Sequence, residues 1–286
     1  MEINMPSVRT CVNRYTSIIL CLLSLGGIFS HSSLFATSFK ATQQELSRIP
    51  AHEQFILERF FQMLVTSDGL GYTLFGSKPI CLSAYFESVP LGNRLKGCRS
   101  DAIKKGWETW QKYEKHFPHP RYLVFSEREN INDTVIHTIY ILDKEKTIAT
   151  LNQHQALFQR ELGRNIDAEH ILSHIEQSHT LAILNNHEGL LGVLLGYGEE
   201  SAMKYHKRNL IWKIGLPLSY EELQPTTDLL PHFMLPLIQP IQFVGNPQSP
   251  EVISILKQNL KEREHLLDIN SQGNFLEITL ARLMLN

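Results

Sequence analysis

The sequence lacks the excess of positive charge that a nucleic-acid-binding surface requires. Its 27 lysines and arginines are nearly balanced by 29 aspartates and glutamates. Because electrostatic attraction to phosphates supplies much of nucleic-acid affinity, this balance argues against a nucleic-acid partner. Internal repeats and low-complexity segments are also lacking, which excludes repeat architectures.

Complete catalytic signatures are lacking as well. No Gly-x-Ser-x-Gly elbow occurs, and no serine or cysteine has a recognisable base at a typical spacing. The segment Gly71 to Lys78 resembles a phosphate-binding loop, but its serine and lysine stand in the reverse order. Pro79 then leads into a β-type run, where a phosphate loop needs a helix N-terminus. We therefore expect no nucleotide cofactor and favour a non-enzymatic role.

The sequence has 13 histidines but no complete metal-binding pattern. His170 and His174 are four residues apart, so they could share one face of a helix, with His179 or His187 as a further ligand. The zinc-hydrolase form of this pattern needs glutamate after the first histidine, where Ile171 stands. A solvated helix face is the alternative interpretation, and we predict no metal as a working expectation.

Cysteine is scarce, with four residues in the chain. Cys11 and Cys21 lie in an N-terminal segment that we expect to be removed. Cys81 and Cys98 remain as a disulfide candidate, and a bridge across this loop of about 18 residues would remove roughly 3 kcal/mol of unfolded-chain entropy. The alternative is a buried Cys81 that is unrelated to Cys98.

The start of the chain has the layout of a secretory signal. Arg9 and Arg14 precede the apolar run Tyr15 to Phe29, and small or polar residues follow up to Ala36. We expect cleavage after Ala36 and an exported protein, either periplasmic, envelope-associated or secreted. The alternative is an uncleaved N-terminal anchor, which would then provide the chain's contact with a membrane.

Residues 37–286 are predicted to form one α+β domain that is mostly helical. A small antiparallel sheet of about four strands would come from two hairpins. The first would pair Tyr72–Phe75 with Ile80–Phe86 around Gly76-Ser77, and the second would pair Tyr122–Ser126 with Thr134–Leu142. Helices are expected at 42–65 with a break at Pro50, 101–116, 144–162, 167–178, 180–195, 199–212, 250–267 and 274–285.

Two glycine-marked turns are the candidate binding elements. Tyr72 and Lys78 are expected to face outward beside the first turn, where a partner could meet them. Gly192 and Gly196 are four residues apart on a predicted helix, which lets a backbone or a ligand approach closely. Tight helix packing with a glycine-ended corner is the interpretation that we favour, and a binding site is the alternative. The predicted binding residues are Tyr72, Lys78, Gly192, Gly196, Tyr197 and Gly198.

Three strings in the sequence resemble an uncharacterised family of secreted or envelope-associated proteins from intracellular bacteria. They are GYTLFGSKP at 71–79, LLGVLLGYG at 190–198 and FVGNPQSPE at 243–251. The resemblance implies export and a shared fold, but it implies no activity. We therefore expect an exported, non-enzymatic interaction module with an envelope or host protein partner. The alternative is a hydrolase whose site is assembled from scattered His, Asp or Glu side chains.

Overall fold

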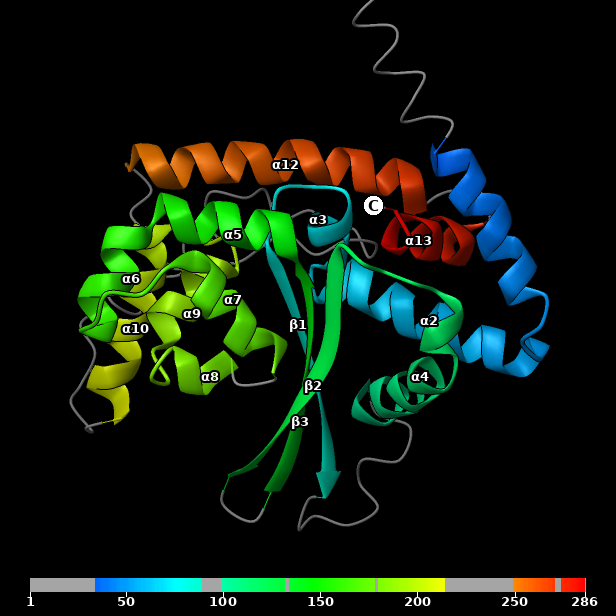
Figure 1. The fold of residues 1–286 in the computed structure, drawn as a ribbon, viewed down its shortest axis with the longest axis horizontal. Coiled ribbons are helices and arrows are strands. Elements are labelled where there is room, and N and C mark those ends of the chain that lie inside the picture. Colours follow the sequence, from blue (N-terminus) through cyan, green and yellow to red (C-terminus); the bar gives the residue numbers. More distant parts are fainter. Residues whose placement is uncertain are drawn as a thin grey trace, which may run out of the picture.

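The protein is mostly helical and has a small antiparallel sheet at its centre, as the α+β prediction requires. The computed structural model describes residues 34–88, 99–131, 134–177, 180–213, 249–270 and 274–285. The sheet separates two groups of helices, and the long helix α12 runs across both groups at one end (Figure 1). The N-terminal segment up to residue 33 and the region 214–248, with its possible strand at 241–244, lie outside the described residues.

The sheet has three strands in the described residues, not the four that we predicted. They are β1 (Ile80–Ser88), β2 (Tyr122–Ile131) and β3 (Thr134–Asp143), in the order β1-β3-β2. The predicted second hairpin is confirmed as β2 and β3. The central strand β3 pairs with both neighbours, so Ile141 lies opposite Cys81 on β1 and opposite Val124 on β2.

The predicted first hairpin is wrong, because Leu70–Leu74 forms the short helix α3. Gly69 adopts a φ of +84°, which lets the chain turn directly from α2 (Ala51–Ser67) into α3. The N–H groups of Gly76 and Lys78 then donate to the Tyr72 carbonyl at 3.2 and 3.1 Å, so Gly76-Ser77 is no strand-to-strand turn. β1 consequently pairs with β3 instead.

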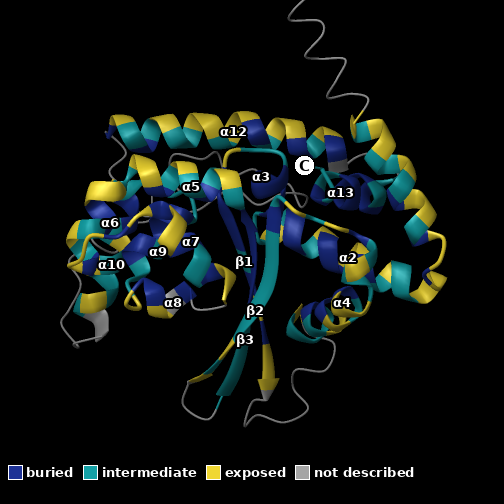
Figure 2. Cartoon of the chain, viewed as in Figure 1, coloured by how far each residue is buried: buried dark blue, intermediate teal, exposed yellow. Residues whose placement is uncertain are grey.

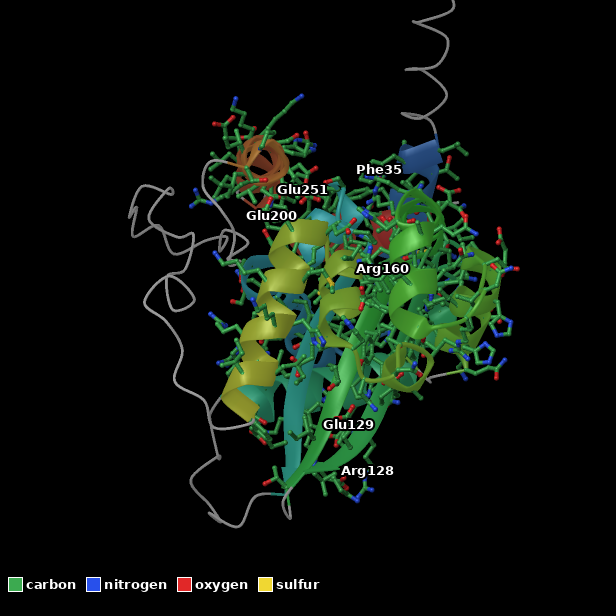
Figure 3. All side chains as sticks on the ribbon, turned by 90° about the vertical axis from the view of Figure 1, so that its left-hand side faces the viewer. Phe35, Arg128, Glu129, Arg160, Glu200 and Glu251 are labelled. Carbon is green, nitrogen blue, oxygen red and sulfur yellow. The ribbon has the colours of Figure 1, made fainter. Side chains whose placement is uncertain are left out.

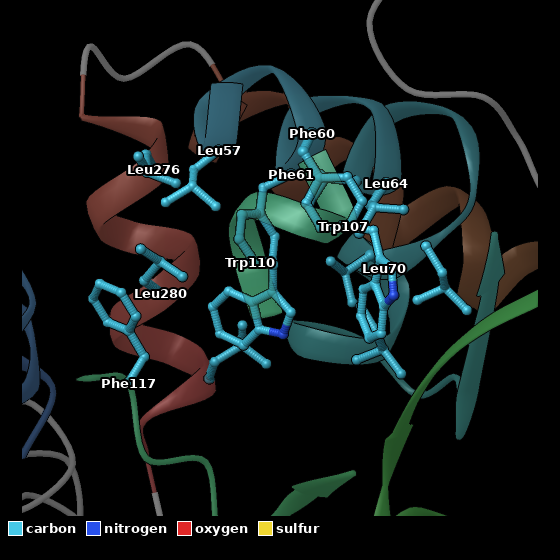
Figure 4. Close-up of a cluster of buried hydrophobic side chains, with 14 of the residues drawn as sticks. Leu57, Phe60, Phe61, Leu64, Leu70, Trp107, Trp110, Phe117, Leu276 and Leu280 are labelled. Atoms are coloured by element: carbon cyan, nitrogen blue, oxygen red, sulfur yellow. The ribbon is translucent and has the colours of Figure 1, made fainter. Parts of the chain in front are cut away.

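One face of the sheet packs against a core of aromatic and leucine side chains (Figure 4). This core is supplied by α2, α3, α4 (Arg99–Tyr113), α13 (Phe275–Leu283) and Phe117, which follows the 3-10 turn Glu114–His116. Trp110 is fully buried, and its ring meets Phe61 edge-on with centroids 5.3 Å apart. A helix over residues 34–46 precedes α2, so the predicted break at Pro50 is confirmed. Phe55 was expected in the buried stripe but is 63% exposed.

Gly106 is the residue that brings α2 and α4 close together. A Cβ atom at Gly106 would lie 2.4 Å from the Cβ of Phe60, a distance that atoms in real side chains do not reach. Glycine destabilises a helix interior relative to alanine, but here only glycine lets α2 and α4 pack this closely.

The other face of the sheet packs against six short helices. Their bounds are α5 Lys144–Gln153, α6 Gln155–Leu162, α7 Ala168–Glu176, α8 Thr180–Ile183, α9 Glu188–Leu194 and α10 Glu199–Lys213. Gly163 ends α6 with a φ of +64°, and Asp167 caps α7 by accepting from the His170 N–H at 2.7 Å, both as predicted. The helix predicted over 180–195 is interrupted because Asn185 and Asn186 have positive φ angles of 53° and 55°.

Helix α12 (Pro250–Asn270) joins the two sides of the molecule. It begins as predicted, with the Ser249 hydroxyl accepting from the Val252 N–H at 3.5 Å. Its inward side buries Val252, Leu266 and Ile269 against Tyr72, and its outward side is exposed (Figure 2). No helix in the described part of the chain is long and apolar enough to cross a membrane.

Candidate functional site

The first glycine turn lies inside the molecule, contrary to the prediction that its side chains face outward. Tyr72 is fully buried in α3, and Lys78 is 7% exposed. The local sequence suggested exposure because turns usually lie at the surface. Here the turn is covered by segments more than 100 positions away in the sequence, which are the α9–α10 corner and α12.

The second glycine turn packs directly against the first. Gly196 and Gly198 have φ angles of +80° and +75°, which side chains other than glycine rarely adopt. A Cβ atom at Gly196 would lie 3.6 Å from both the Lys78 Cγ and the Pro79 Cδ. The Tyr197 ring centroid is 5.8 Å from the Lys78 Nζ. The structure thus brings the two predicted elements together.

Gly192 and Gly198 serve packing rather than an open surface. A Cβ atom at Gly192 would lie 2.9 Å from the Ala202 Cβ, so this glycine allows α9 and α10 to approach. A Cβ atom at Gly198 would lie 2.5 Å from the Ile255 Cδ1, so this position allows α12 to approach the turn. Tight packing with a glycine-ended corner, the interpretation favoured above, describes these two positions.

Helix α12 is fixed over the two turns by two carboxylates. Glu251 accepts hydrogen bonds from the Glu199 and Glu200 N–H groups at 2.9 and 3.0 Å, at the start of α10 (Figure 3). Eleven positions later on the same helix, Glu262 accepts from the Ser77 N–H at 2.9 Å. A carboxylate that accepts from free N–H groups is a strong, charge-assisted contact. Between these two contacts α12 spans the first and second turns.

A cavity of about 480 Å³ lies between α12 and the two turns. Its wall includes Gly196 and the polar side chains of the first turn and of the middle of α12. The described lining residues are Ser77, Lys78, Gly196, Ser254, Ile255, Lys257, Gln258, Asn259 and Lys261. Three of them are lysines and none is acidic. The cavity therefore has a positive wall.

Two of the lining residues carry polar groups with no hydrogen bond to the described part of the chain. The Asn259 Nδ2 is buried without an acceptor. The Lys78 ammonium makes no hydrogen bond or ion pair with the described residues, although its Nζ lies near Gly69 and the Tyr197 ring. Buried polar groups in proteins are normally paired, so each of these two groups requires an explanation.

Burial governs the electrostatics around Lys78. Loss of solvent lowers the pKa of the Lys78 ammonium, and the nearby Asp68 only partly opposes this effect. Asp68 is itself paired with Arg99. The neighbouring Cys81 thiol is buried too, which raises its pKa to about 12 and makes it unreactive.

A second buried charge cluster is structural, and it explains why α3 forms. Asp143 is fully buried and accepts from Arg121 at 2.7 and 3.0 Å, which raises the pKa of Arg121. Lys146 approaches the same carboxylate at 3.3 Å and also donates to the Thr73 carbonyl, while Arg282 donates to the Leu74 carbonyl at 2.8 Å. Cations at the last carbonyls of α3 stabilise that helix end.

The three histidine candidates that the structure describes, His170, His174 and His187, do not gather into a metal site. His170 is exposed on α7, and the His174 ring is tilted against it with ring centroids 4.3 Å apart. His187 caps α9, because its Nδ1 accepts from the Leu190 N–H at 3.1 Å. His179 lies outside the described residues. Within the described ranges, no group of three or more His, Cys, Asp or Glu side chains could hold a metal ion.

Cys81 is a buried free thiol whose Sγ donates to the Asp68 carbonyl at 3.3 Å. Cys98 lies outside the described residues, so the Cys81–Cys98 bridge stays a prediction.

Sequence reasoning missed the contribution of α12 to the cavity. The helix was predicted from its start signal and its apolar positions, and no role was assigned to Lys257, Asn259 and Lys261. Their spacing, with Ser254 one turn earlier, places them on adjoining stripes of one helix. This spacing was the only signal available, and it does not reveal which element faces the stripe.

No protein-family model, no curated protein and no solved structure matches this chain. The family resemblance described above therefore stays a prediction, and no residue role is transferred from another protein.

Proposed function

We propose that this chain is an exported, non-enzymatic binding module whose site is the cavity between α12 and the two glycine turns. The occupant is a small molecule, or a projecting group of a larger envelope or host component. The observation that carries the proposal is the cavity itself, which at about 480 Å³ falls within the size range of small-molecule sites. The proposal that the protein is exported rests on the signal-like start of the sequence.

The burial of the first turn favours a ligand that enters the protein. Tyr72 and Lys78 are not available to a flat protein surface, since 0% and 7% of these residues are exposed. A small group in the cavity, in contrast, can contact the Lys78 stem and the Gly196 backbone together. Glycine at this position lets a ligand approach the main chain closely.

The hydrolase alternative has no metal-binding cluster in its favour within the described residues. His170 and His174 contact each other on α7. His187 caps α9, and it also lies 3.5 Å from Glu161 and stacks on His206. The Cys81 thiol has a raised pKa and is buried, so it does not suit a nucleophile.

A cavity-filling variant tests the proposal. We expect Ser254→Trp to block the cavity, because Ser254 lines it from α12. Glu264→Trp is the matched control, since Glu264 is exposed on the same helix and does not line the cavity. Each protein is incubated with the small-molecule fraction of an envelope extract and analysed by native mass spectrometry.

We expect the wild type and Glu264→Trp to retain one added mass each, and Ser254→Trp to retain none. Equal uptake by both tryptophan variants, with equal melting temperatures, would show that the cavity is not the binding site.

A further inference from the structure

We infer that the cavity binds the phosphate group of a small phosphorylated molecule. This inference rests on the proposed function and names the ligand class for the same site. It is carried by the charge, the hydrogen-bond donors and the residue types of the cavity wall.

The wall combines three lysines with no acidic side chain among the described residues that line it. Lys78, Lys257 and Lys261 line it, and a phosphate monoester carries close to two negative charges at neutral pH. Glu262 on α12 does not line the cavity: its Oε1 accepts from the Ser77 N–H and from Gln258, and its Oε2 lies against Gly76 without a hydrogen bond to the described residues. A dianion therefore meets a net positive surface.

The residue types suit a phosphate group. Lysine acts as a point charge and is a common phosphate ligand. All three cationic residues among the described residues that line the cavity are lysines. The Ser77 and Ser254 hydroxyls add further donors to the wall.

Two unusual features of the wall have one explanation if an anion binds there. The Asn259 Nδ2 is a buried donor without an acceptor, and an entering phosphate oxygen would supply one. Lys78 is a buried cation with no ion pair among the described residues, and an anion in the cavity would offset its charge.

The remaining space fits a small organic group beyond the phosphate. About 480 Å³ is more than a single inorganic anion fills, and typical small-molecule sites are of this order. Ile255 and the Gly196 backbone provide the less polar part of the wall. The geometry thus fits a phosphorylated metabolite or the phosphate head of a lipid.

Isothermal titration calorimetry at fixed ionic strength tests the inference with glycerol 3-phosphate and inorganic phosphate as probes, and glycerol as the uncharged control. A parallel arm measures binding to phosphatidylcholine vesicles with and without phosphatidic acid, which separates a lipid source from a soluble one. The variants are Lys257→Gln, Lys261→Gln and Asn259→Asp. The control is Lys207→Gln, because Lys207 is an exposed lysine on α10 outside the cavity.

We expect saturable binding of a phosphate probe in one of the two arms and none of glycerol. Lys257→Gln and Lys261→Gln should each weaken binding roughly three- to tenfold, the effect of losing one partly exposed charge-assisted contact. Asn259→Asp should weaken binding by more than tenfold, because it replaces a donor with a negative charge of the same shape. Lys207→Gln should change nothing.

Absence of saturable phosphate binding in both arms would overturn the inference. So would equal weakening by Lys207→Gln, which would indicate nonspecific attraction to surface lysines. If a ligand from the extract is excluded by Ser254→Trp but is not displaced by glycerol 3-phosphate, the binding module stands and only the phosphate assignment fails. If Ser254→Trp has no effect on uptake, the proposed function itself fails.

Discussion

Replacement of Lys78 by methionine should stabilise the protein at neutral pH. Lys78 is 7% exposed, and its ammonium makes no hydrogen bond or ion pair to the residues that the structure describes. Methionine has a similar length and keeps the packing of the stem, whose Cγ lies against Gly196. The substitution therefore removes the charge and little else.

The magnitude follows from three opposing contributions. Removal of the charge relieves a desolvation penalty of several kcal/mol, the effective cost of a buried ion in a protein. The variant loses the contact between the Lys78 ammonium and the Tyr197 ring, worth about 1–2 kcal/mol when desolvated. It also loses a weak attraction to Asp68, which Arg99 already neutralises. The expected net gain is about 1–3 kcal/mol at pH 7.

The gain should depend on pH in a predictable direction. Burial lowers the pKa of Lys78 below its ordinary value of 10.5, so the unfolded chain binds a proton that the folded chain has already released in the window between the two values. In that window, the free energy of unfolding of the wild type rises with pH. The advantage of Lys78→Met is therefore largest below the folded-state pKa and narrows as the pH approaches 10.5.

Urea unfolding followed by tryptophan fluorescence measures the effect at pH 7 and pH 10. Lys207→Met is the control for an exposed lysine, and it should leave the urea midpoint nearly unchanged at both pH values. A loss of stability in Lys78→Met of more than about 1 kcal/mol at pH 7, with no dependence on pH, would refute the reasoning. It would mean that the ammonium is already compensated in the folded protein.

Three further perturbations have defined outcomes. Gly106→Ala should lower the free energy of unfolding by about 1–3 kcal/mol in urea titrations despite the better helix propensity of alanine, because the new Cβ overlaps Phe60; an unchanged or higher midpoint would contradict this packing. Asp143→Ala should cost about 3–5 kcal/mol in the same assay, since two cations lose a fully buried carboxylate; a cost below 1 kcal/mol would place the cluster near solvent. Cys81 should resist iodoacetamide at pH 8 in the folded protein and react after denaturation under reducing conditions, because burial raises its pKa to about 12; peptide mass mapping would reveal rapid native labelling if the thiol were accessible.

The parts of the fold that could be predicted are those whose signals are local. Asp167 caps α7, Gly163 ends α6 and Ser249-Pro250 begins α12 because each effect acts within one helical turn. The β2–β3 hairpin was recognised for the same reason, since both strands and their turn are contiguous in the sequence.

The parts that could not be predicted depend on distant partners. Leu70–Leu74 has aromatic and β-branched residues that favour a strand, yet its last carbonyls are held by Lys146 and Arg282, which are 73 and 208 positions away. Lys78 looks like a surface turn residue until Gly196 and α12 cover it. The candidate site could therefore be predicted only in part. Its two turns could be identified by their glycines, but the wall supplied by α12 could not.

The two carboxylate contacts of α12 also determine when the cavity can form. Glu262 closes a loop back to Ser77 across 185 positions, and Glu251 reaches α10 across 52 positions. Contacts over such separations are formed late, because the chain between them must first be ordered. The wall that α12 supplies to the cavity can therefore form only after residues far downstream of the first turn have been synthesised and have packed against it.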